Sequence, residues 1–238
     1  METSRKNTII AGALYLLGFI AGILSIASAV DDPEYLIKTA ANANQTLFAA
    51  LFQFVMIVAY LGIAITLYPI VKKFNERLAL GFLSFRIIGT VFILIGVILL
   101  LLIMTISQDY VRTGSSNLPM FQLIGGLLRT GRDYVNHIAM IVSLNIGGIM
   151  LYLLLYKARL VPKWLSVWGI IGAIITIIAS FLIMFRLIDI ITPEYMIMNV
   201  PIALQELTFA IWLIVKGFDR KVITSMNENK ITNAQYRV

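Results

Sequence analysis

The sequence contains no cysteine and only one histidine among its 238 residues. Without cysteine the chain cannot form disulfides, thiolate metal sites or cysteine nucleophiles. The single histidine, His137, cannot supply the two or three imidazoles of the common zinc sites or both ligands of a bis-histidine haem. A His/Met haem stays open by residue count, but no pattern points to one. We therefore expect no metal and no cofactor.

Charged residues are also scarce, at 13% of the chain, whereas soluble domains carry about 25%. Hydrophobic residues make up 60%, and the mean hydropathy is +0.91. Three catalytic patterns are absent as well: GxxxxGK[ST], HExxH and GxSxG. This composition is typical of a membrane protein, and no residue is assigned as catalytic.

Long hydrophobic runs are what the sequence does contain. Crossing the hydrocarbon core of a bilayer takes roughly 20 apolar residues in a helix. Six runs meet this length: 9–30, 47–71, 80–106, 134–156, 164–186 and 196–215. We predict an all-α membrane protein whose residues 1–218 form one six-helix transmembrane bundle. Residues 219–238 are predicted to be a polar, flexible cytoplasmic tail.

Basic residues predict the orientation of this bundle. The formal net charge of +7 comes from short clusters at the ends of apolar runs, which argues against a nucleic-acid surface. These clusters fall on alternate connections, and an excess of Lys and Arg marks the cytoplasmic side. Both termini are therefore expected to be cytoplasmic. The clusters are Arg5 and Lys6; Lys72, Lys73 and Arg77; Lys157, Arg159 and Lys163; and Lys216, Arg220 and Lys221.

Two segments allow a second interpretation. The first run resembles a secretory signal with a cleavage site at 27–29, but its apolar stretch from Ile9 to Ile26 exceeds the usual core of about 7–15 residues. We expect it to be retained as a helix. The connection 107–133 contains the apolar piece 118–128, which is too short to span and is predicted to be interfacial or re-entrant.

Two ionisable residues lie inside the apolar runs. Arg86 follows Arg77 by nine residues, and Glu206 precedes Lys216 by ten, so both lie about 10–15 Å from the same membrane surface. A lone arginine at this depth costs about 2.5–3.5 kcal/mol on insertion scales. We therefore predict that the two side chains meet and form an intramembrane polar centre. They serve either a proton, ion or anionic ligand, or only the packing of two helices.

Other polar and small residues are weaker candidates. Asp133, Asn136 and His137 form a possible polar cluster on the outer side, or they are ordinary interfacial hydrogen-bonding residues. Gly18 and Gly22 form a GxxxG step, which serves either packing within the bundle or a homodimer contact. Packing within the bundle is the simpler interpretation, and nothing else in the sequence indicates a homodimer.

Several short motifs carry a resemblance to a known family. They are AGALYLL at 11–17, LYP at 67–69, FR at 85–86, YLLLY at 152–156, VP at 161–162, and Glu206 followed by IWLIVKGF at 211–218. Over residues 8–218 the chain resembles the bacterial multi-pass membrane family known as domain of unknown function 4386. The resemblance implies a six-helix protein of the bacterial cell membrane, and it implies no activity, cofactor or catalytic residue.

Three kinds of function remain open from the sequence. The first is binding or moving a small ligand, ion or proton through the bundle by means of Arg86 and Glu206. The second is a structural or regulatory role, in envelope stress, immunity or partner binding, without transport. The third is an intramembrane enzyme, which lacks an evident nucleophile or metal beside Glu206. The expected partners are the lipid bilayer and a small-molecule or ion ligand, with no nucleic acid.

Overall fold

The computed structural model describes residues 2–114 and 117–226, and within them the protein is helical without strands. Six helical segments are long and apolar enough to cross a membrane, which confirms the predicted number. The helices are α1 (Glu2–Leu24), α2 (Ser28–Asp31), α3 (Tyr35–Ala41), α4 (Ala43–Val71), α5 (Glu76–Arg112), α6 (Leu118–Tyr134), the π-helix η1 (Val135–Met140), α7 (Ile141–Ala158), α8 (Lys163–Met184) and α9 (Pro193–Val215).

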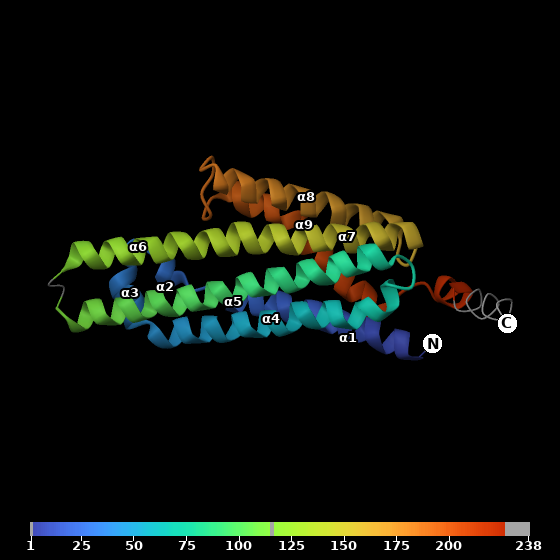
Figure 1. Ribbon diagram of the computed structural model, residues 1–238, viewed down its shortest axis with the longest axis horizontal. Coiled ribbons are helices and arrows are strands. Elements are labelled where there is room, and N and C mark those ends of the chain that lie inside the picture. Colours follow the sequence, from blue (N-terminus) through green and yellow to red (C-terminus); the bar gives the residue numbers. More distant parts are fainter. Residues whose placement is uncertain (1, 115–116, 227–238) are drawn as a thin grey trace.

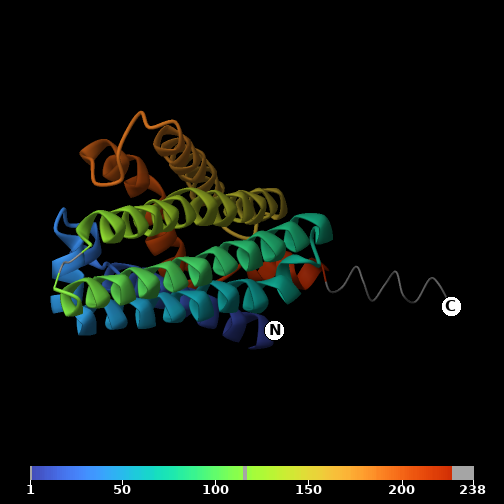
Figure 2. The same cartoon turned by 60° about the vertical axis from the view of Figure 1, so that its left-hand side comes forward.

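The six spanning segments form a closed ring. Each of α1, α4, α5, α7, α8 and α9 packs against the next in this order, and α9 returns to pack against α1 (Figure 1). The start of α1 and the segment that follows α9 lie at the same end of the bundle, which we call the terminal end (Figures 1 and 2). The loop between α8 and α9 and the short helices α2 and α3 lie toward the other end, which we call the distal end.

The helix boundaries have local causes. The Asn75 side chain accepts a hydrogen bond from the Leu78 N–H at 3.0 Å and so caps α5. Thr192 caps α9 in the same way, with Pro193 at the first helical position. Arg159 ends α7 in the left-handed conformation, at φ 54°. The turns at these positions reverse the chain and give neighbouring spans opposite directions.

The interior of the ring is packed densely toward the terminal end. The main core cluster brings together fully buried side chains from several spans, among them Leu67, Phe82, Leu151, Phe209 and Leu213. The outer surface is apolar as well. Large side chains more than half exposed occur on α1, α4, α5, α8 and α9, which suits contact with lipid: Ile20, Val58, Ile65, Ile98, Ile171 and Ile211.

The connection predicted at 107–133 is different in the structure. The helix α5 continues to Arg112, and the segment 118–128 is the start of a helix that runs through η1 to Ala158. It is therefore not a separate re-entrant or interfacial piece. At 1.5 Å per residue α5 is about 55 Å long and α8 about 33 Å, so the α5–α6 hairpin extends past the α8–α9 loop (Figure 1).

Two further boundaries are corrected. The first predicted run, 9–30, ends as a helix at Leu24, and Ser28–Asp31 form the separate helix α2. Residues 220–226 of the predicted flexible tail are helical, and Val222 and Ile223 pack against the main core cluster. The folded part of the protein therefore extends past residue 218. The remainder of the predicted tail, 227–238, lies outside the described residues.

Candidate functional site

The two predicted intramembrane charges lie next to each other in the centre of the ring. Arg86 projects from α5 and Glu206 from α9, and Arg86 Nη2 lies 3.7 Å from Glu206 Oε1. The Arg86 side chain is 2% exposed, whereas the Glu206 side chain is 30% exposed. Both residues come from the long spans predicted to hold them, and their similar depth follows from similar distances to the terminal end. Glu206 is thus the accessible member of the pair.

Aromatic rings surround the Arg86 guanidinium. The rings of Tyr15 on α1, Tyr60 on α4 and Phe82 on α5 have centroids 5.7, 5.4 and 5.6 Å from Arg86 Cζ. Arg86 Nη2 also donates a hydrogen bond to the Tyr15 hydroxyl at 3.4 Å. A cation held over aromatic faces away from water gains about 2 kcal/mol or more. These rings reduce the cost of burying the charge, and the Tyr15 hydroxyl also takes up one of its hydrogen-bond donors.

The donors of Arg86 are incompletely used. A guanidinium has five N–H donors, and charge-assisted bonds to carboxylates are normally about 2.7–2.9 Å long. Here the carboxylate distance is 3.7 Å, and Arg86 Nε has no hydrogen-bond partner within the described residues. Buried donors of this kind are usually satisfied, and a charged one is costly to leave open. Arg86 therefore keeps an unpartnered, fully buried Nε donor next to a long ion-pair contact.

A small cavity lies beside the pair. Its volume is about 150 Å³, and its lining includes Arg86, Glu206, Tyr60, Asn145 and Thr176. The space is enough for a few water molecules or a small polar group. Glu206 therefore faces an internal space, which explains its exposed fraction inside an apolar bundle.

A much larger cavity opens toward the distal end. Its volume is about 930 Å³, within the range of small-molecule binding sites, and its walls come from α1, α4, α5, α6, η1 and α9. Most of the lining is apolar, with residues such as Met56, Ile93 and Val200. Met140, Ile141 and Asn199 line both the large and the small cavity. The two spaces therefore adjoin each other along one wall.

The predicted outer cluster lies in this large cavity. Asp133, Asn136 and His137 all line it. His137 Nδ1 is hydrogen-bonded to the Tyr195 hydroxyl of α9 at 2.9 Å, which ties η1 to α9. The cluster is thus part of a ligand-sized space.

An ion pair that the sequence did not suggest lies beside this cluster. Arg132 Nη1 lies 3.1 Å from Asp31 Oδ1 and 3.8 Å from Asp133 Oδ1, and the Arg132 side chain is 8% exposed. Arg129 donates to the Asp31 carbonyl at 3.2 Å and lies over the Tyr35 ring at 4.5 Å. These contacts join α6 to the α2–α3 segment, and Asp31, Arg129 and Arg132 all line the cavity.

Two groups on the α2–α3 segment have shifted pKa values. The hydrogen bond from Lys38, 2.5 Å long, is the main cause that lowers the pKa of Asp32. Burial raises the pKa of the Tyr35 hydroxyl, while the charge of Arg129 acts in the opposite direction. Asp32 therefore keeps its charge at neutral pH at the rim of the large cavity, which it lines.

The π-helix η1 forms the wall where the two cavities meet. It contains Asn136, His137 and Met140, and α6 and α7 continue it on either side. A Cβ atom at Gly96 of α5 would collide with the Asn136 side-chain amide, which would then have to move. Short π-helical segments inside α-helices often occur at functional sites, because the extra residue redirects nearby side chains.

The predicted GxxxG step makes contacts inside the bundle. A Cβ at Gly18 would lie 3.0 Å from Tyr60 Cε1 on α4, whereas one at Gly22 would meet only Met56 Cε, at 3.9 Å. The tightest glycine of α1 is Gly12, where a Cβ would lie 2.7 Å from the Ala210 carbonyl oxygen on α9. Gly18 and Gly12 thus serve packing against α4 and α9, and Gly22 lines the large cavity.

The structure contains features that sequence reasoning missed. Tyr15, Tyr60 and Tyr152 surround the polar centre, and each lies well inside an apolar run, where a tyrosine hydroxyl needs a partner. A tyrosine inside an apolar run is therefore a sequence signal that could have indicated this polar centre. No three His, Asp or Glu side chains gather as a metal ion would require within residues 2–114 and 117–226.

Comparison with known families adds to this geometry. The domain of unknown function DUF4386 matches residues 10–217, which is most of the chain and includes Arg86, Glu206 and both cavities. The protein belongs to the DUF4386 family. No curated protein and no solved structure matches it. For this DUF4386 protein, the family match and the six apolar helices support a multi-helix membrane bundle and indicate no specific activity.

Proposed function

We propose that the protein binds a small ligand in the large cavity at the distal end, called the distal cavity below, and that the ligand reaches the Arg86–Glu206 pair. The proposal rests on one observation: the large and small cavities share Met140, Ile141 and Asn199 as lining residues. A pair that served packing alone would need no space beside it. The apolar walls suit an aliphatic or aromatic portion of the ligand, and the charge of Arg86, which lines the small cavity, suits an anionic or acceptor group.

The proposal includes an orientation. We infer that the terminal end is cytoplasmic and that the distal cavity opens to the outside of a bacterial cell membrane. Several basic residues of the distal end are already paired: Arg132 with Asp31, Arg112 with Asp109 and Lys38 with Asp32. The clusters at 72–77, 157–163 and 216–221 have no carboxylate partner in the described part of the chain, and such clusters are retained on the cytoplasmic side.

Thiol labelling tests the orientation, because the chain has no cysteine of its own. Lys73→Cys, in the turn after α4, should be protected from an impermeant reagent in intact cells and should react after lysis. Asp189→Cys, in the loop between α8 and α9, should react in intact cells. The opposite pattern would place the distal cavity on the cytoplasmic side.

Thiol labelling at the small cavity tests whether a ligand can reach the Arg86–Glu206 pair. Thr176 on α8 is 2% exposed and lines the small cavity, whereas Ser180, one turn further, is 0% exposed and lines neither. Thr176→Cys should react with small water-soluble thiosulfonates. Ser180→Cys should react only through local opening of the helix packing, which slows labelling by roughly 100-fold or more.

Two further measurements distinguish a ligand path through the large cavity from entry of water alone. Ala203→Phe should fill part of the large cavity, which Ala203 lines, and slow the labelling of Thr176→Cys. An anionic reagent should lose its rate relative to a cationic one when Arg86 is changed to Gln. If Thr176→Cys and Ser180→Cys react at equal rates, the pair has no access path and the structural or regulatory alternative takes the place of ligand binding.

A further inference from the structure

A third cavity lies at the terminal end, on a different part of the molecule. Its volume is about 820 Å³, and its walls come from the α7–α8 turn on one side and the end of α9 with residues 216–220 on the other. Three membrane-spanning segments end at its edge: α7 at Ala158, α8 at Lys163 and α9 at Val215. The cavity therefore lies at the level where lipid headgroups meet the protein.

Hydrogen bonds hold the two walls in place. The Asp219 N–H donates to the Leu160 carbonyl at 2.9 Å, which fixes the segment after α9 against the α7–α8 turn. Trp212 Nε1 donates to the Gly217 carbonyl at 3.1 Å, and Gly217 has the positive φ of 73° that allows the chain to turn there. Leu160 and Phe218 are buried beneath. The cavity is a formed feature of the fold.

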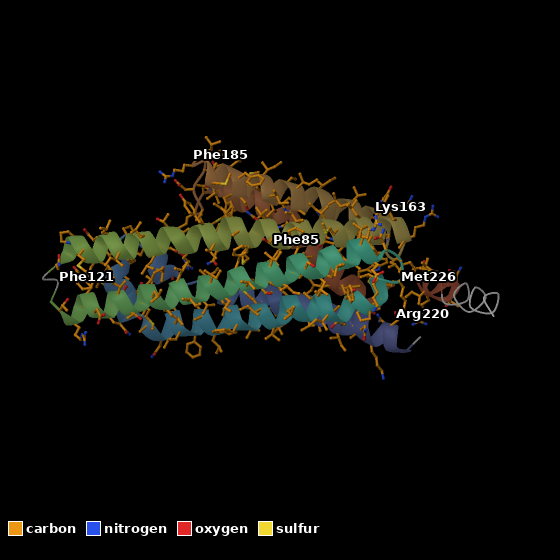
Figure 3. The ribbon with its side chains drawn as sticks, in the orientation of Figure 1. Phe85, Phe121, Lys163, Phe185, Arg220 and Met226 are labelled. Carbon is orange, nitrogen blue, oxygen red and sulfur yellow. The ribbon has the colours of Figure 1, made fainter. Side chains whose placement is uncertain are left out.

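The side chains that line this cavity are strongly basic. Four exposed bases line it: Arg159, Lys163, Lys216 and Arg220. Figure 3 labels Lys163 and Arg220 at this end of the bundle. None of the four has a carboxylate partner within the described residues. Asp219 is the one acid in the lining, and its carboxylate accepts hydrogen bonds from the backbone N–H groups of Lys221 and Val222. The lining thus carries a formal charge of +3 from four bases and one acid.

A nearby arginine, Arg5, makes the hydrogen bonds expected of a basic residue with a structural role. The Arg5 guanidinium donates to the carbonyls of Leu213, Ile214 and Val215 at the end of α9, at 2.8, 2.5 and 3.2 Å. The four bases of the cavity make no comparable contacts with carboxylates or helix ends. Cytoplasmic retention of positive charge explains basic loops, but it does not require four bases to line one concave space.

We propose that this cavity binds the phosphate group of an anionic phospholipid in the leaflet at the terminal end. Arginine and lysine together suit phosphate oxygens, since Arg binds them with paired donors and Lys as a compact charge. Trp212 and Val215 give an apolar wall on the membrane side, where the glycerol and first methylenes of a lipid would lie. Basic pockets between spans are a recurring form of anionic-lipid site.

Thermal unfolding in lipid nanodiscs tests the site. With phosphatidylglycerol added to phosphatidylcholine, the wild-type Tm should rise by roughly 5–10 °C, the shift given by a ligand at about a hundredfold its dissociation constant. The triple variant Lys163→Gln, Lys216→Gln, Arg220→Gln should lose most of this rise. The triple variant Lys72→Gln, Lys73→Gln, Arg77→Gln removes the same charge at the same end and should keep it.

Further measurements distinguish a membrane lipid from a free phosphate compound, and binding in this cavity from attraction by overall positive charge. Glycerol phosphate added to phosphatidylcholine nanodiscs should give little of the shift if a membrane lipid is the ligand, and an equal shift would identify a free phosphate compound instead. Equal losses in both triple variants would mean that overall positive charge, and not this cavity, attracts the lipid. The absence of any rise in the wild-type protein would also overturn the proposal.

Discussion

Glu206→Gln is expected to lower the free energy of unfolding by about 3 kcal/mol. Removing one partner of a buried ion pair typically costs 3–5 kcal/mol, because the other charge stays buried without compensation. The remaining charge would be Arg86, which is 2% exposed and already has an unpaired Nε. The Tyr15 and Tyr60 rings keep the cost toward the lower end. In detergent this corresponds to a Tm lower by roughly 6–12 °C.

The double variant provides the decisive comparison. Arg86→Gln alone should also destabilise, and Arg86→Gln with Glu206→Gln should cost less than the sum of the two by about 1–3 kcal/mol. Glu194→Gln, the same change in the exposed first turn of α9, should cost less than about 1 kcal/mol. Additive effects of the two central changes would show that Arg86 and Glu206 do not act as a pair.

Gly12→Ala is expected to have the second large effect, a loss of about 2 kcal/mol. The new Cβ would lie 2.6 Å from Ile214 Cγ1 and 2.7 Å from the Ala210 carbonyl oxygen, so α1 and α9 must separate. Overpacking of this kind costs about 1–3 kcal/mol. Because α9 carries Glu206 and closes the ring against α1, the separation should also weaken the Arg86–Glu206 contact.

Two glycines of the same helix serve as controls. Gly18→Ala should lose less, because the Tyr60 ring, 3.0 Å from the new Cβ, can shift. Gly22→Ala should be neutral or stabilising, since its surroundings are open and alanine is favoured over glycine in helices by about 0.8–1.0 kcal/mol. Thermal unfolding of the three variants in one detergent gives the order. Equal changes at Gly12 and Gly22 would mean that the close α1–α9 contact at Gly12 does not control stability.

The two proposed sites lie in different parts of the bundle. The distal cavity and the Arg86–Glu206 pair lie inside the ring, whereas the terminal cavity lies where α7, α8 and α9 end. The helix α9 contributes to both, with Glu206 in the first and Trp212 and Val215 in the second. Each site can be tested without the other, since their lining residues do not overlap.

The sequence predicted the number of spans and the central pair for simple reasons. Span number follows from the length of apolar runs against a fixed bilayer thickness, so no tertiary information is needed. The meeting of Arg86 and Glu206 follows from the cost of an isolated charge in lipid together with similar depths in two helices. The same reasoning misplaced the segment 118–128, because this apolar piece is too short to span and is followed by the charged residues Arg129, Arg132 and Asp133.

Only the tertiary structure decided how that interruption is resolved and where space is left open. Arg132 is neutralised by Asp31, a hundred residues earlier in the chain, so the helix continues through the charged turn. The cavities depend on where α1 and α9 touch, through Gly12 near the terminal end, and where they leave room around Gly22. Apolar length is a property of one segment and can be predicted from sequence. Pairing and empty space are properties of several segments at once, and only their packing determines them.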